Sequence, residues 1–210
     1  MKKTIVVCLI LACVICSERS IGQSLSTEVT GMEAAWAFSG SYNTTMSKTS
    51  KISFSNINRL SSDYFGEEDV HMLIMTNFGY ALTPKIKSTI GEIYTDGGGL
   101  KPSVGLQYMV SKKHFLTVIF PNVNIGKRSD LMFIFMSQYL WNISQKIKFV
   151  LRLQSLSLAN SDGHIFSTFK FRSGLVRGKY QFGAASDLNF SGNECELAPS
   201  FGLFLQCQLF

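Results

Sequence analysis

Residues 70–82 read VHMLIMTNFGYAL and decide the fold, because their side chains alternate in character along the chain. In a β-strand, successive side chains point to opposite faces. One face of this segment is almost wholly apolar and carries Val70, Met72, Ile74, Thr76, Phe78, Tyr80 and Leu82. The other face mixes polar and small residues with apolar ones: His71, Leu73, Met75, Asn77, Gly79 and Ala81. This pattern predicts a strand that ends in a tight turn at Thr83-Pro84-Lys85, where proline fixes φ and cannot donate to the ladder.

Extended segments of the same kind recur on both sides of this strand. We expect strands at 33–44, 51–60, 70–82, 86–95, 100–110, 114–123, 131–141, 146–156, 164–176, 180–190 and 199–210. These are eleven candidates, whereas a bacterial barrel with both termini on one side of the membrane requires an even number. We therefore expect about ten strands, with eight to twelve as alternatives. Either one N-terminal candidate is misplaced or a further strand lies in residues 23–32.

Short turns alternate with longer polar loops along this series. The expected short turns are 83–85, 111–113, 142–145 and 177–179, and the longer loops between them are 96–99, 124–130, 159–163 and 191–196. Outer-membrane barrels have tight periplasmic turns and longer external loops. Aromatic residues cluster beside the short turns, where an interfacial girdle would lie: Phe78, Tyr80, Tyr108, Tyr139, Trp141 and Tyr180.

The composition fits a single domain that buries or exposes to lipid much of its surface. Only 16% of the 210 residues are charged, against about 25% in typical globular chains. After Gln23 no stretch approaches the roughly 20 apolar residues of a spanning helix, and the densest, LMFIFM at 131–136, is far shorter. A sheet in hydrocarbon must close, because an open edge would leave backbone N–H and C=O groups unpaired.

A secreted β-sandwich is the soluble alternative, and it requires one polar face on each strand. Residues 115–120 and 131–136 are instead apolar on both faces. Strands that are apolar on both sides suit a narrow barrel whose interior is filled by side chains. We therefore predict an all-β, antiparallel, up-and-down transmembrane β-barrel of about ten strands, with a packed interior.

Residues 1–22 have the form of an export signal peptide, with a positive start and an apolar core at 4–16. Small residues place its cleavage before Gln23, so the barrel is expected to occupy 23–210, with 23–32 either an irregular segment or a further strand. A lipoprotein cleaved before Cys13 is the alternative. Cys195 and Cys207 would lie roughly 40 Å apart on one extended strand, so we expect no disulfide between them.

Basic residues on the predicted inward faces are the one candidate binding feature. They are Lys101, Lys148, Arg152, Lys170 and Arg172, accompanied by Gln107 and Gln154. A basic interior focuses positive potential and favours small anions. The alternative is that these charges pair with inward acids such as Asp187 or are solvated at a rim. The net charge of +6 comes without a dense Lys/Arg stripe, so we expect no nucleic-acid partner.

The three histidines, His71, His114 and His164, show no metal-ligand spacing, and we expect no metal, cofactor or catalytic site. A Ser–His hydrolase in a barrel wall, as in outer-membrane phospholipases, would require a histidine and a serine placed together on the lipid face. His114 or His164 with Ser111 or Ser167 are the candidates. Serines are abundant, however, and we expect no enzymatic activity.

Several segments between residues 70 and 210 resemble uncharacterised outer-membrane barrel proteins of bacteria that use type IX secretion. The matching segments are LKPSVGLQY at 100–108, LRLQ at 151–154, YQFG at 180–183 and FGLF at 201–204. More distantly, YMVSKKHF at 108–115, followed by FPN at 120–122, is similar to a strand pair of the PorP/SprF family. That resemblance implies a connection with type IX secretion and gliding. The family's NPAYAG-like opening is absent from residues 36–42.

These patterns predict a non-enzymatic barrel of the bacterial outer membrane, serving as an envelope structural component or docking platform. Its expected partners are outer-membrane lipid and secretion or envelope proteins. A narrow, anion-favouring channel is the first alternative, and a lipid-modifying barrel enzyme is the second.

Overall fold

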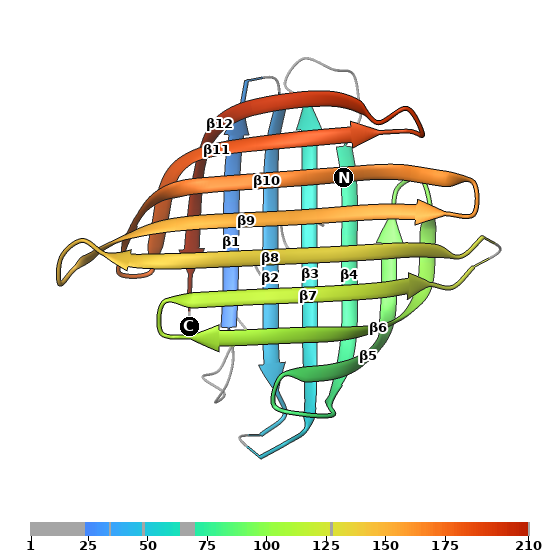
Figure 1. The fold of residues 1–210 in the computed structure, drawn as a ribbon, viewed down its shortest axis with the longest axis horizontal. Helices are drawn as coiled ribbons and strands as arrows, with labels where there is room; N and C mark the ends of the chain where they lie inside the picture. The colour runs from blue at the N-terminus through green and yellow to red at the C-terminus, as the bar shows by residue number, and fades with distance from the viewer. Residues whose placement is uncertain (1–23, 34, 48, 64–69, 127, 210) are drawn as a thin grey trace, which may run out of the picture.

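The computed structural model describes residues 24–33, 35–47, 49–63, 70–126 and 128–209 (Figure 1). These residues form twelve strands: β1 (Ser24–Met32), β2 (Ala35–Thr45), β3 (Ile52–Asp63), β4 (Val70–Ala81), β5 (Ile86–Thr95), β6 (Gly99–Lys112), β7 (Phe115–Asn124), β8 (Asp130–Asn142), β9 (Ile147–Asn160), β10 (Gly163–Arg177), β11 (Tyr180–Ser191) and β12 (Glu196–Gln208). None of the described residues form a helix long and apolar enough to cross a membrane.

The sheet closes on itself as an up-and-down barrel. Each strand pairs antiparallel with the next, and β12 pairs back onto β1, with Glu28 opposite Gln206. The predicted fold class is confirmed, and the strand number is twelve instead of about ten. The twelfth strand is β1, so the alternative that a further strand lies in residues 23–32 is confirmed, and the alternative that this segment is irregular is wrong.

The strand at residues 24–32 is hard to predict because few large apolar residues alternate with its polar ones. Leu25 and Val29 are the only large apolar residues on the face that points outward. Pairing on both sides, with β2 and with β12, fixes this segment as a strand where local propensity does not. The predicted signal peptide, Cys13 and the terminal Phe210 lie outside the described residues.

The two faces of the strands divide as the sequence pattern indicates. On β4, Phe78 and Tyr80 are half-exposed on the outside, whereas Met75 and Asn77 are buried inside. On β12, Phe201, Leu203 and Leu205 are all more than half exposed. An apolar outer wall of this kind is suited to lipid.

The aromatic residues predicted for a girdle are exposed near the end of the barrel that also holds the first residues of β1 and the last of β12. Tyr139 and Trp141 on β8 stack at 4.3 Å between ring centroids, and Trp141 reaches Phe149 on β9 at 5.7 Å. The expected alternation of turns between the two ends is confirmed. The expected difference in their lengths is not, because residues 46–51, at the end with the termini, match the six-residue segment 64–69 at the other end.

The interior is packed because side chains from different parts of the wall meet there. Strands β7 to β11 in front cross β1 to β4 behind (Figure 1). A buried cluster of Met75, Ile93, Phe120 and Met132 joins β4 and β5 to β7 and β8. A second cluster contains Met32, Val150, Ala185 and Phe204. A small cavity near Lys101 and Asp130 measures about 20 Å³, which is room for one water molecule.

Candidate functional site

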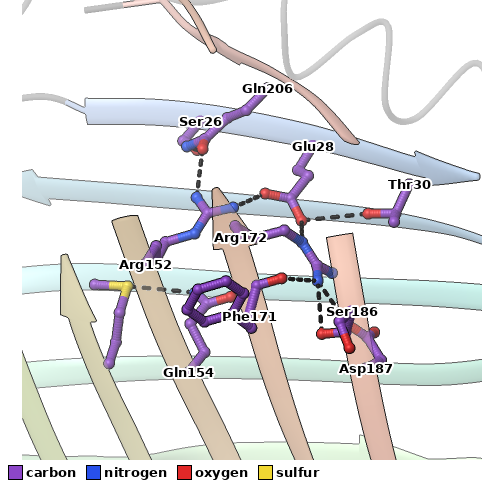
Figure 2. A network of polar contacts seen from close by, with 11 residues as sticks. Ser26, Glu28, Thr30, Arg152, Gln154, Phe171, Arg172, Ser186, Asp187 and Gln206 are labelled. Atoms are coloured by element: carbon purple, nitrogen blue, oxygen red, sulfur yellow. Dashed lines mark hydrogen bonds and ion pairs between the residues drawn. The ribbon is translucent and has the colours of Figure 1, made fainter. Parts of the chain in front are cut away.

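A network of charged side chains crosses the interior of the barrel (Figure 2). Its centre is Glu28 on β1, whose carboxylate accepts hydrogen bonds from Arg152 on β9 and from Arg172 Nε on β10, the latter at 3.1 Å. Arg172 Nη1 also donates to Asp187 Oδ1 on β11 at 2.5 Å. Thr30 Oγ1 donates to Glu28 Oε1 at 3.3 Å. The network thus joins four strands, and Glu28 reaches across the barrel to non-neighbouring ones.

The network is almost completely removed from solvent. The side chains of Arg172 and Arg152 are 1% and 5% exposed, and that of Glu28 is 8% exposed. Buried charges are tolerated only when they are paired and hydrogen-bonded. Arg152 accordingly also donates to Gln206 on β12, whose amide nitrogen donates to Ser26 Oγ at 2.7 Å. Hydrogen bonds and ion pairs therefore connect residues at the β1–β12 seam with β9 and β10 across the barrel.

Two further cations face the interior without a direct ion pair. Arg59 on β3 lies opposite inward-facing Leu73, and Lys170 on β10 lies between Gln154 on β9 and Asp187 on β11. Neither makes an ion pair or side-chain hydrogen bond within the described part of the chain. The interior therefore holds Arg59, Arg152, Lys170 and Arg172 against the two carboxylates of Glu28 and Asp187. Positive charge is in excess at this level of the barrel.

The structure places the five sequence candidates at inward-facing strand positions, and their grouping was not predicted. Arg152, Lys170 and Arg172 come together, whereas Lys101 pairs with Asp130 on β8 and Lys148 lies near the end with the termini. The alternative of pairing with inward acids is confirmed for Arg172 and Asp187. Sequence reasoning missed Glu28, because its segment was left irregular, and Arg59, because the alternation of β3 is weak.

The histidines have different surroundings. His71 and His114 make no side-chain hydrogen bond among the described residues, and His114 Nδ1 is a buried atom without a partner. His164 Nε2 lies 2.8 Å from Ser167 Oγ, and its Nδ1 lies 2.7 Å from the carbonyl oxygen of Gly192. The pair that the sequence named as a hydrolase candidate, His164 with Ser167, is therefore in contact. Cys195 and Cys207 are both free thiols, as predicted.

Comparison with known proteins supports the fold and leaves the activity open. No protein-family model matches the chain, and no curated protein is similar to it. Among solved structures, the NanC porin is 9% identical, with 90% of this chain and 99% of the porin covered and a TM-score of 0.52. LpxR from Salmonella typhimurium (8% identity, 88% and 99% covered) and a bacterial polysaccharide outer membrane secretin (7%, 92% and 99%) each give a TM-score of 0.45. The closed barrel with its apolar outer wall is that of a bacterial outer-membrane protein, as predicted.

Proposed function

We propose that this protein is a non-conducting barrel that serves the outer membrane as an envelope component or docking platform, through its outer surfaces and rims. The observation that supports this role is the filled interior. Met75, Val150 and Arg172 come from different parts of the wall, and each is at most 1% exposed. A water-filled porin would instead keep its inward side chains in contact with solvent.

Conductance in a planar lipid bilayer tests this proposal. We expect the purified, folded protein to insert without producing single-channel steps, while a porin added to the same bilayer does. Insertion is verified separately by protease protection in vesicles made from the same lipid. Regular steps from the inserted protein would contradict a closed lumen.

A narrow anion channel is the second candidate function, and the excess of cations favours it. Arg59 and Lys170 make no direct ion pair among the described residues, and the four cations at this level outnumber the carboxylates of Glu28 and Asp187. A positive interior that opened transiently would favour anions. Reversal potentials measured in a KCl gradient distinguish the two roles. Equal permeability to chloride and potassium, or no current at all, would contradict an anion channel.

The connection with type IX secretion is carried only by the resemblance of short segments and remains a proposal. We expect a docking role to produce crosslinks in intact cells between the exposed rims and a secretion or gliding component. Crosslinks that are unchanged in a strain lacking that machinery would contradict the connection.

A further inference from the structure

A serine and a histidine meet on the outer wall of β10, near the end of the barrel opposite the termini. Phe169 is 42% exposed on the outer wall, and Thr168 beside it is buried inside. Side chains two residues apart share a face, so Ser167 lies on the outer face of β10 with Phe169, where neighbouring side chains leave it 8% exposed. Ser167 Oγ lies 2.8 Å from His164 Nε2 and 2.9 Å from the Oγ of Ser157 on β9.

A β-bulge brings the two residues together. On a regular strand, residues three apart point to opposite faces. The register of β10 against β9 shifts between His164, which pairs with Ala159, and Phe166, which pairs with Leu158. The extra residue returns His164 to the face of Ser167. Bulges of this kind redirect side chains and are frequent beside active sites.

The hydrogen bond to Gly192 determines which histidine nitrogen is basic. A carbonyl oxygen only accepts, so His164 Nδ1 must carry the proton that it donates to Gly192 O at 2.7 Å. In neutral histidine this leaves Nε2 with a free lone pair, directed at Ser167 Oγ. The Ser167 hydroxyl donates to Ser157 in the structure, and rotation about its Cβ–Oγ bond directs the same proton to Nε2. A serine hydrogen-bonded to an oriented histidine is the arrangement of an activated nucleophile.

Ser167 lies between an apolar part of the outer wall and a polar rim. Ser167 is the fifth residue of β10, which places it roughly 10 Å below the rim for a tilted strand. At and below its level the wall presents Phe190, Phe169 and Leu188, with Phe169 and Phe190 in edge contact at 5.8 Å. Above it the rim is polar, where Arg128 pairs with Asp162 at 2.5 Å and Asn193 donates to Asp162 O. The ester groups of membrane lipids lie at such a boundary between acyl chains and headgroups.

We propose that Ser167 and His164 form a hydrolytic site for the acyl esters of membrane lipids, with the Gly192 carbonyl as the positioning group. Ser167 Oγ attacks the ester carbonyl carbon, and its proton passes to His164 Nε2. The bond from that carbon to the lipid alcohol breaks, the alcohol leaves with the proton from Nε2, and the acyl group stays on Ser167. A water molecule from the rim, deprotonated by Nε2, then releases the fatty acid and restores the hydroxyl. This activity goes beyond the proposed function and does not depend on whether the lumen conducts.

Two measurements on the folded, full-length barrel test this site. The first is covalent labelling by a fluorophosphonate, which reacts with activated serines and is located by peptide mass. The second is fatty-acid release from vesicles of phosphatidylethanolamine and, separately, from vesicles containing lipopolysaccharide. We expect label on Ser167 and release from at least one vesicle type, and the type identifies the substrate.

The variants separate chemistry from folding. Ser167→Ala is expected to abolish label and release, and His164→Gln to lower both by about 10²- to 10⁴-fold, the usual contribution of a general base. Ser155→Ala is the matched control, because Ser155 lies on the same outer face of β9 opposite Phe169 and belongs to no part of the pair; it should retain both activities. Heat-modifiable gel migration shows that each variant is folded. The proposal is overturned if wild-type Ser167 takes up no label, or if wild type and Ser167→Ala release fatty acid equally.

Discussion

Glu28 is the residue on which the internal network depends, since it is the carboxylate shared by two buried arginines. Replacing it by glutamine keeps its shape and removes its charge, which leaves Arg152 without an anion. Removing one partner of a buried ion pair costs about 3–5 kcal/mol. We therefore expect Glu28→Gln to lower the free energy of unfolding in lipid vesicles by about that amount, measured by urea titration of tryptophan fluorescence.

The matched control is Glu196→Gln. Glu196 is an exposed carboxylate at the start of β12, whereas Gln206, which contacts the network, lies near the end of that strand. That substitution should change the free energy of unfolding by well under 1 kcal/mol, as surface substitutions generally do. Equal free energies of unfolding for Glu28→Gln and wild type would show that other groups or water stabilise the charges of the two arginines. In that case the network would not be what joins β1 to the opposite wall.

At the scale of elements, the strands with strong alternation were predictable and their long-range partners were not. The segments of β4, β6 and β9 show their two faces in the sequence, which is why Arg152 was assigned to the interior. Glu28 lies 124 residues from Arg152, and nothing local indicates that barrel closure brings them together. The contact of His164 with Ser167 was equally hidden, because it depends on a bulge that regular alternation does not reveal.

The seam between β1 and β12 makes a prediction at this scale. A Cβ added at Gly202 would clash with the carbonyl oxygen of Gly31 and the Cα of Met32, both in the backbone of β1. A backbone clash is relieved only if the two strands separate. We expect Gly202→Ala to destabilise the barrel by about 1–3 kcal/mol, the usual cost of overpacking, and to lower the temperature at which the fast-migrating folded form is lost on gels.

Gly97→Ala is the control for the seam, since Gly97 lies in the loop after β5 and an added Cβ there meets nothing within 4 Å. It should leave the transition temperature unchanged. If Gly202→Ala loses its folded form at the same temperature as wild type, then β1 and β12 tolerate a wider spacing at Gly202 than the structure shows.

At the scale of the whole molecule, side chains from opposite walls of the twelve-strand barrel meet in the interior, and the proposed closure to ions depends on that contact. A round barrel of this strand number would be wider than the small barrels that side chains fill. The charged network crosses the interior from β1 to β9, β10 and β11, so we expect its removal to open a polar path. The proposed closure would therefore depend on a few large side chains inside a wall that could otherwise enclose a pore.

Replacing Glu28, Arg152 and Arg172 together by alanine tests this view, because it removes the bulk of the network from the interior. We expect the triple variant to give single-channel steps in planar bilayers where wild type gives none. Arg59 and Lys170 remain in the path with only Asp187 to offset them, so the reversal potential in a KCl gradient should show a preference for chloride. Lys148→Ala is the control, since Lys148 lies away from the network near the end with the termini, and it should stay silent. A triple variant that is folded by gel migration yet equally silent would mean that the apolar clusters alone seal the barrel.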